Sequence, residues 1–140
     1  MLSTDPQRRA LMQRVRQRGT PAENIVAAAC RDIGIHYRRN VKSLPGTPDL
    51  ANQSGRWAIF VNGCFWHGHR GCAMATVPKR NGDFWREKFM ANRRRDAIKA
   101  RALRARGFRV LIVWECETAD VVTLRRRLSK LRKTRIVEPA

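Results

Sequence analysis

Three candidate metal ligands, Cys64, His69 and Cys72, fall within nine residues of an irregular stretch, and Cys116 follows much later in the chain. Thiolates and imidazole are the ligands that zinc prefers, and three cysteines with one histidine are a common structural set. The stretch 62–83 is rich in Gly, His, Cys and Pro, and it has little apolar material for a core of its own. The spacing therefore predicts a zinc-bound loop that Cys116 ties to the end of the preceding strand. The alternative is that these residues are ordinary buried thiols.

The helix expected over residues 21–33 has the clearest local signals. Thr20 is a suitable N-cap, and Pro21 occupies the first helical position. Glu23 stands at the capping-box position, and Gly34 is a natural stop.

Apolar runs and turn signals predict the remaining elements. Strands are expected at 35–41, directly after the Pro/Gly turn 44–49, at 57–61, and as a central strand at 108–114; basic helices are expected at 84–106 and 119–132. This order predicts a small α/β domain with a mixed central sheet flanked by helices. The expected boundaries are a basic flexible arm over 1–19, the folded domain over 20–133 and a short tail over 134–140. The alternative for the arm is a solvated segment without function.

Charge is the strongest feature of the composition. Thirty Lys and Arg stand against eleven Asp and Glu, a formal net charge of +19. A domain this basic indicates a polyanionic partner, and nucleic acid is the usual one. Arg outnumbers Lys, which favours forked contacts to phosphate or guanine.

The sequence also indicates where such a chain works. No apolar run approaches the roughly 20 residues that span a membrane, and the Arg-rich N-terminus lacks the apolar segment of a secretory signal. Four cysteines are too few for a disulfide scaffold of this length. We therefore expect a cytoplasmic monomer with reduced thiols, in which Cys30 is an inert core residue and His36 is structural or at the surface.

Asp49 is the acidic residue with the most suggestive position. It follows Pro48 at the start of a predicted strand, and this pair resembles the first half of the PD-(D/E)xK nuclease core. A carboxylate there can hold a divalent cation that activates water and neutralises phosphate charge. The second half, an acid-x-Lys on the next strand, is absent, because that strand ends Phe60-Val61-Asn62. Glu23 is either a capping acid worth about 0.5–1 kcal/mol or a carboxylate that holds water on the metal.

Five motifs in the same order resemble the very short patch repair (Vsr) DNA mismatch endonuclease family over about residues 8–132. They are Thr20-Pro21-Ala22-Glu23, Leu44-Pro45-Gly46-Thr47-Pro48-Asp49, Val61-Asn62-Gly63-Cys64-Phe65-Trp66-His67-Gly68-His69 with Cys72, Asp83-Phe84-Trp85, and Val110-Leu111-Ile112-Val113-Trp114-Glu115-Cys116. The resemblance implies one restriction-endonuclease-like domain of the PD-(D/E)xK type with a structural zinc loop. It also implies a strand-specific enzyme that nicks DNA beside the T of a T·G mismatch.

The resemblance assigns roles to individual residues. Asp49 binds the catalytic Mg²⁺, with the backbone carbonyl of Val61 as a second ligand. His67 acts at the scissile phosphate as general base or phosphate contact, and Glu23 supports the metal-bound waters. Structural Zn²⁺ is held by the four residues of the ligand argument above, namely Cys64, His69, Cys72 and Cys116.

Three aromatic residues are implied to wedge into the base stack beside the mismatch, namely Phe65, Trp66 and Trp85. Inserted aromatics unstack DNA at a cost of a few kcal/mol per step, and a mismatch lowers that cost. The alternative for these residues is core packing, which is the expectation for the neighbouring Phe84.

One position departs from the family pattern. The family commonly has a histidine where this chain has Asn62, and an amide donates hydrogen bonds but carries no proton. Asn62 thus joins the expected catalytic set, while His67 alone does the general-base work. Two alternatives remain: a nickase or restriction-like endonuclease without strict T·G dependence, and a catalytically weak module that recognises distorted DNA. The implied partners are double-stranded DNA with a T·G mismatch, a mismatch-recognition protein and a cytosine-5 DNA methylase system, in a bacterial-type nucleoid.

Overall fold

The computed structural model describes residues 20–65, 69, 72 and 77–133. In these residues the elements follow the order α2 (Pro21–Asp32), β1 (Arg38–Arg39), β2 (Leu50–Asn52), β3 (Trp57–Asn62), α3 (Gly82–Ala105), β4 (Arg109–Trp114), the 3-10 helix η2 (Glu115–Ala119) and α4 (Val121–Lys133). The predicted arm and tail lie outside the described residues, as do Trp66 and His67. The described part is a small α/β domain, as predicted.

The four strands form one mixed sheet in the order β1-β2-β3-β4. The first two pairings are antiparallel, and β3 pairs with β4 in parallel after the crossover through α3. The prediction that 108–114 is a central strand was wrong for the described sheet, because β4 lies at its edge. Its apolar run has another cause: Leu111 packs against one core cluster, and Val110 and Ile112 pack against the other. Burial on two faces, and not a second neighbouring strand, makes the run continuous.

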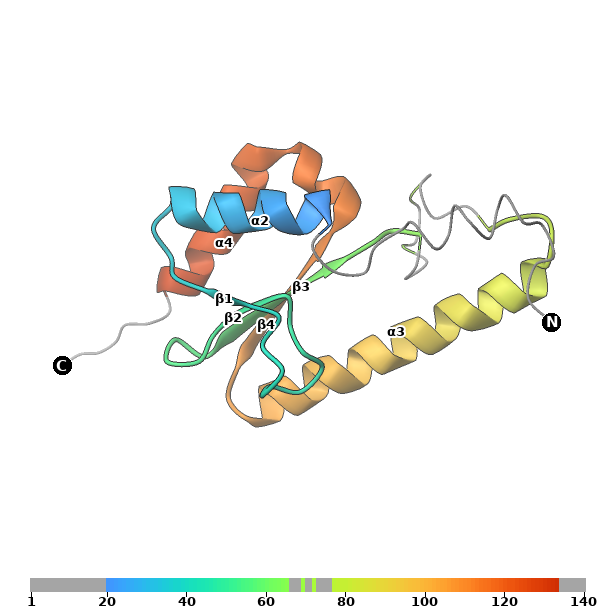
Figure 1. Cartoon of the computed structure of the whole chain (residues 1–140), viewed down its shortest axis with the longest axis horizontal. Coiled ribbons are helices and arrows are strands. Elements are labelled where there is room, and N and C mark those ends of the chain that lie inside the picture. Colours follow the sequence, from blue (N-terminus) through green and yellow to red (C-terminus); the bar gives the residue numbers. More distant parts are fainter. Residues whose placement is uncertain (1–19, 66–68, 70–71, 73–76, 134–140) are drawn as a thin grey trace.

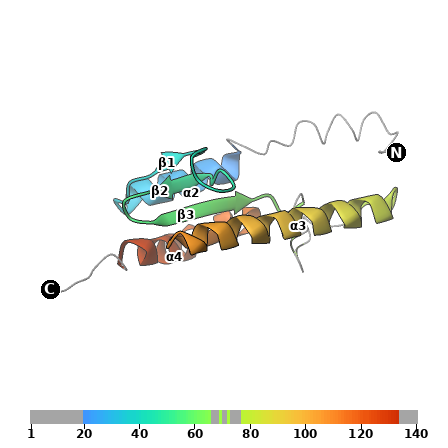
Figure 2. The ribbon, with the colours of Figure 1, turned by 90° about the horizontal axis from the view of Figure 1, so that it is seen from below.

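Helices cover both faces of the sheet, as Figure 1 shows: α2 and α4 lie side by side on one face, and α3 crosses the other. The larger core cluster lies under α2 and α4 and includes Val26, Leu50, Ile59, Leu124 and Leu128. The smaller one lies under α3 and consists of Leu44, Ala51, Ala58, Phe60 and Leu103. In both views the N-terminal half of α3 extends past the ends of the strands (Figures 1 and 2).

The start of α2 confirms the signals at Thr20 and Pro21. Thr20 is the N-cap, its hydroxyl oxygen accepts a hydrogen bond from the Glu23 N–H at 3.2 Å, and Pro21 stands in the first turn. The helix ends before Gly34, whose φ of +77° is a left-handed conformation that glycine adopts without steric cost. The sequence therefore fixes where Glu23 stands on the first turn of α2.

The predicted strand over 35–41 is much shorter than expected, because only Arg38–Arg39 pairs with β2. Its partner strand has three residues, and Asn40 has φ +51°, which ends the extended conformation. The predicted helix over 119–132 begins later, at Val121, because Glu115–Ala119 forms η2. No helix of the described residues combines the length and the apolar character that crossing a membrane requires.

Candidate functional site

Asp49 lies directly before β2 and points at the backbone of β3. Its Oδ2 accepts a hydrogen bond from the Val61 N–H at 2.7 Å. The turn that precedes it has two left-handed residues, Gly46 at φ +76° and Thr47 at φ +48°. A β-branched residue rarely adopts this conformation, and such strain is frequent at functional sites. The structure thus brings together Asp49 and Val61, the two residues expected to hold Mg²⁺.

This turn also packs tightly on α3. A Cβ atom at Gly46 would meet the side-chain carbons of Lys99 at 2.6–2.8 Å, which is closer than real Cβ contacts. The glycine is therefore required both by its φ and by its neighbour. The turn that presents Asp49 is fixed by the α3 side of the sheet as well as by β3.

Glu23 is buried although it is an acid. Its side chain is 1% exposed, and its Oε1 lies 3.7 Å from Nη2 of Arg39. The same Nη2 donates a hydrogen bond to Oδ1 of Asn24 at 2.9 Å. A carboxylate buried to this extent needs a compensating cation, and Arg39 supplies it from β1.

Asn62 ends β3 and is 6% exposed. Its Nδ2 donates a hydrogen bond to Oδ2 of Asp96 on α3 at 3.4 Å. Sequence reasoning missed Asp96, although a signal was present: it stands seven residues after Phe89 and seven before Leu103, both of which are buried. An acid on the buried stripe of a helix is expected to have a polar partner inside the fold.

The four predicted zinc ligands gather at one point, where their donor atoms all lie within 4.8 Å of one another. This Cys/His cluster consists of Cys64, His69, Cys72 and Cys116. Nδ1 of His69 lies 3.6 Å from Sγ of Cys64 and 3.5 Å from Sγ of Cys116. Tetrahedral zinc with bonds of about 2.3 Å to sulfur and about 2.0–2.1 Å to nitrogen separates such donors by about 3.5–3.6 Å. The donor set and its spacing fit a metal ion of this kind.

Backbone groups and one aromatic ring hold the Cys/His cluster in place. The Cys116 N–H donates a hydrogen bond to Sγ of Cys64 at 3.4 Å, and the Cys64 N–H donates one to Oε1 of Glu115 at 3.3 Å. The His69 ring stacks on Trp114 with centroids 4.1 Å apart and planes 6° apart. Trp114 is the last residue of β4, and Cys116 lies two residues beyond it in η2. The end of β4 therefore positions both the ring under His69 and one of the cysteines.

Burial affects the thiol groups of the cluster. Burial raises the pKa of Cys64 to about 12, and it also raises the pKa of Cys116. Thiolates at these positions therefore need a bound cation. Cys30 differs: it is fully buried among apolar residues of the larger core cluster, and burial raises its pKa to about 12 as well. With only apolar neighbours in that cluster, it fits the expected inert core role.

The described aromatic residues of the expected wedge form a cluster at the N-terminal end of α3. The Phe65 ring meets Trp85 and Phe89 edge to face, each at a centroid distance of 5.3 Å. Trp85 is 6% exposed and also contacts Phe84, which is half-buried. Insertion of Trp85 into DNA would therefore require this side chain to leave its neighbours.

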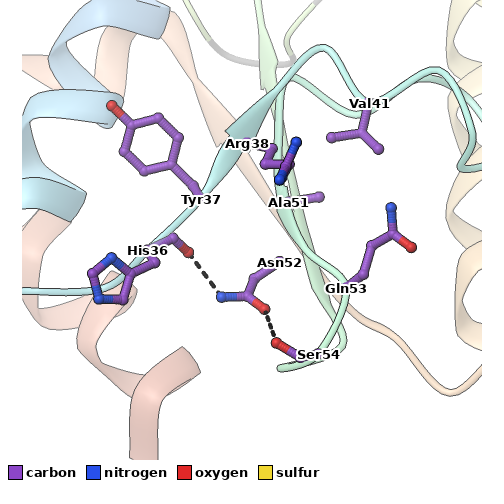
Figure 3. Close-up of a pocket in the computed structure, with 8 residues that line it drawn as sticks. All are labelled: His36, Tyr37, Arg38, Val41, Ala51, Asn52, Gln53 and Ser54. Carbon is purple, nitrogen blue, oxygen red and sulfur yellow. Dashed lines mark hydrogen bonds between the residues drawn. The ribbon is translucent and has the colours of Figure 1, made fainter.

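A separate hollow of about 460 Å³ lies beside β1 and β2 (Figure 3). It contains none of the predicted catalytic residues. Its polar groups serve the neighbouring turn: Asn52 donates a hydrogen bond to the His36 carbonyl, and Ser54 donates one to Asn52, both at 3.0 Å. His36 is exposed, as expected for a structural or surface residue.

Comparison with known proteins gives one consistent family. The family model described as DNA mismatch endonuclease Vsr matches residues 2–73. The type II nicking enzyme V.XorIIP of Xanthomonas oryzae pv. oryzae is 47% identical over 124 residues, which is 89% of this chain and 90% of that protein. The type II nicking enzyme V.NmeAIP of Neisseria meningitidis is 36% identical over 91% of both chains. The DNA mismatch endonuclease Vsr of Escherichia coli is 40% identical over 105 residues, 75% of this chain and 67% of that protein.

A basic α/β domain with an aspartate fixed at the end of its sheet, and with relatives of these names, is a DNA endonuclease. Within that class, the chain belongs to the DNA mismatch endonuclease Vsr family.

Proposed function

We propose that this enzyme nicks one strand of duplex DNA beside the T of a T·G mismatch, in a Mg²⁺-dependent hydrolysis that starts very short patch repair. The observation that carries the proposal is the contact between Asp49 Oδ2 and the Val61 N–H, since it puts a carboxylate beside backbone at the end of the sheet. The name of the Escherichia coli relative supports the mismatch as substrate.

The chain's own groups divide the work of hydrolysis. Asp49 and the Val61 carbonyl would hold Mg²⁺, a cation that lowers the pKa of bound water and neutralises charge on the phosphate. His67, in the part of the chain outside the described residues, takes the proton from the attacking water. Glu23 would orient water at that site. The hydrogen bond to Asp96 fixes the amide of Asn62, which then donates its second N–H to a phosphate oxygen.

The Cys/His cluster is proposed to hold structural Zn²⁺. The four protein donors would complete the coordination of such an ion, which suits a structural and not a catalytic role. Zn²⁺ bound there would link the stretch of chain that carries Phe65, Trp66 and His67 to the residues that follow β4. Phe65, Trp66 and Trp85 then enter the base stack at the mismatch, where stacking is already weak.

A second candidate is a nickase without strict dependence on the mismatch. Two observations favour it: the relatives named type II nicking enzymes, and Asn62 at the position of the family histidine. The third alternative, a binding module with weak catalysis, is disfavoured by membership in a nuclease family. We propose a monomer on chromosomal DNA in the cytoplasm, working beside a mismatch-recognition protein and a cytosine-5 methylase.

A nicking assay separates the two candidates. End-labelled duplexes that differ only in one T·G or C·G pair are incubated with the enzyme, with Mg²⁺ or without it, while zinc is kept constant. A cut beside the T that requires both T·G and Mg²⁺ supports mismatch repair. Cutting of both duplexes supports the broader nickase, and cutting without Mg²⁺ would contradict the role of Asp49.

A further inference from the structure

Arg39 connects elements that carry the two candidate catalytic carboxylates. Its Nη2 lies 3.7 Å from Glu23 on α2, and the same nitrogen donates to Asn24 at 2.9 Å. Arg39 is also the register partner of Leu50, the residue directly after Asp49. The next residue, Asn40, donates its N–H to the Asp49 carbonyl at 3.0 Å.

The two side chains of this contact differ in their exposure to solvent. The Glu23 side chain is 1% exposed, whereas that of Arg39 is 35% exposed. The acid is therefore covered by the fold, while the guanidinium beside it is partly open to solvent. The guanidinium of an arginine still has free N–H donors after it makes one contact. Its planar shape also fixes the geometry of its contacts, which the flexible ammonium of lysine does not.

We propose that Arg39 is a positioning residue for catalysis, which holds the Glu23 carboxylate in place at the metal-water site while Asn24 fixes the guanidinium. The proposal rests on the role given to Glu23 above. The local strand suits this role, because β1 has only two residues and its backbone is tied through Asn40 to the backbone of Asp49. Displacement of the Arg39 side chain would thus disturb Glu23 without moving Asp49.

The test uses the full chain with Arg39→Ala and Arg39→Lys, and with Arg38→Ala as matched control. Arg38 is the other residue of β1, and it faces the hollow of Figure 3 on the opposite side of the strand. Nicking of a saturating T·G duplex is measured in single turnover over a range of Mg²⁺ concentrations. Thermal unfolding shows that each variant is folded at the assay temperature.

For Arg39→Ala we expect the nicking rate at saturating DNA to fall by about 10–100-fold, with a higher Mg²⁺ requirement, as is usual for partners behind a metal site. Arg39→Lys recovers part of the rate, and Arg38→Ala retains it. A higher KM for DNA with an unchanged rate would make Arg39 a phosphate contact and overturn the proposal. If Arg39→Ala lowers stability but changes neither the nicking rate nor the Mg²⁺ dependence, the contact between Arg39 and Glu23 is only a structural ion pair. That outcome also overturns the proposal.

A double-mutant cycle with Glu23→Gln tests whether Arg39 acts through Glu23. If it does, Arg39→Ala has little further effect in the Glu23→Gln background, because coupled residues are not additive. Full additivity would overturn the proposal. A wild-type rate in Glu23→Gln would also overturn it, yet the wild-type enzyme would still nick T·G, so this outcome is distinct from failure of the proposed function.

Discussion

Asp49 and Cys64 lie at the same end of the sheet, but different forces hold them there. Asp49 is fixed by strand pairing: it precedes β2, accepts from the Val61 N–H, and its turn packs on Lys99 of α3. Cys64 is held differently. It lies beside the other donors of the Cys/His cluster, its N–H donates a hydrogen bond to Glu115, and the ring of His69 stacks on Trp114.

The difference separates a region held by strand pairing from a region whose side chains could hold a metal ion. The backbone contacts around Asp49 form as soon as the sheet forms. The Cys/His cluster brings one buried and two partly exposed cysteines together with His69, and the thiolate forms of these cysteines need a cation to compensate their charge. Changes to the metal ligands should therefore leave the sheet in place, and changes at Asp49 should leave the loop in place.

Of the changes that test this difference between the two regions, replacement of Cys116 by serine should have the largest effect on stability. Structural zinc sites contribute apparent binding energies on the order of 10 kcal/mol, and they depend on the complete ligand set. We expect loss of the metal, a lower unfolding temperature and loss of nicking, measured by metal analysis, thermal unfolding and the nicking assay. Cys30→Ala is the matched control, since Cys30 lies in the apolar core and should leave the metal content unchanged. Stoichiometric metal in Cys116→Ser would contradict the ligand assignment.

Asp49→Asn should remove catalysis and spare both the fold and any metal content of the Cys/His cluster. The asparagine oxygen can still accept from the Val61 N–H, but the ligand charge is lost. A metal contribution of several kcal/mol corresponds to about a thousandfold in rate. The readouts are single-turnover nicking and the unfolding temperature, and nicking at the wild-type rate would remove Asp49 from the mechanism.

Leu128→Ala should weaken the sheet region alone. Leu128 is fully buried between α4 and the sheet, and truncation of such a residue costs about 3 kcal/mol. Denaturant unfolding should show this loss, while metal content and the nicking rate of the folded fraction stay the same. A loss of zinc from the folded protein would mean that the two regions are less independent than their contacts indicate.

The smallest effect is expected for Thr20→Ala, which removes the hydrogen bond at the start of α2. Loss of such a cap costs about 1 kcal/mol. Thr20→Ser keeps the hydroxyl and serves as control in the same unfolding measurement. An equal loss in both variants would show that the methyl group, and not the cap, stabilises this end.

The sequence predicted those parts of the molecule that depend on local chemistry. The cap at Thr20, the stop at Gly34 and the gathering of Cys64, His69, Cys72 and Cys116 were all predicted, because each follows from residue type and spacing. The strand 35–41 and the central place of 108–114 were not, because both depend on which strands pair. The local sequence of 35–41 does not show that its partner strand is short. The local sequence of 108–114 does not show that the strand lies at an edge of the sheet that helices cover.

The same limit applies to the candidate site. The contacts of Arg39 with Glu23 and of Asn62 with Asp96 join residues 16 and 34 positions apart. They follow from the register of β1 on β2 and from the face that α3 turns to the sheet, and neither is encoded in a motif. Motifs therefore locate the acidic and metal residues, whereas tertiary structure shows what holds them.

The parallel register of β3 on β4 also bears on the order of folding events. It pairs each residue of β3 with the residue 52 positions later, from Trp57 with Arg109 to Asn62 with Trp114. The entropy of closing so long a loop is lost when the two strands pair, which makes this pairing the slow step. Cys64 and Cys116 become neighbours when these strands pair, because Cys64 follows the end of β3 and Cys116 follows the end of β4. Metal loading should thus follow sheet formation, and in hydrogen exchange a metal-free chain should still protect β3 and β4.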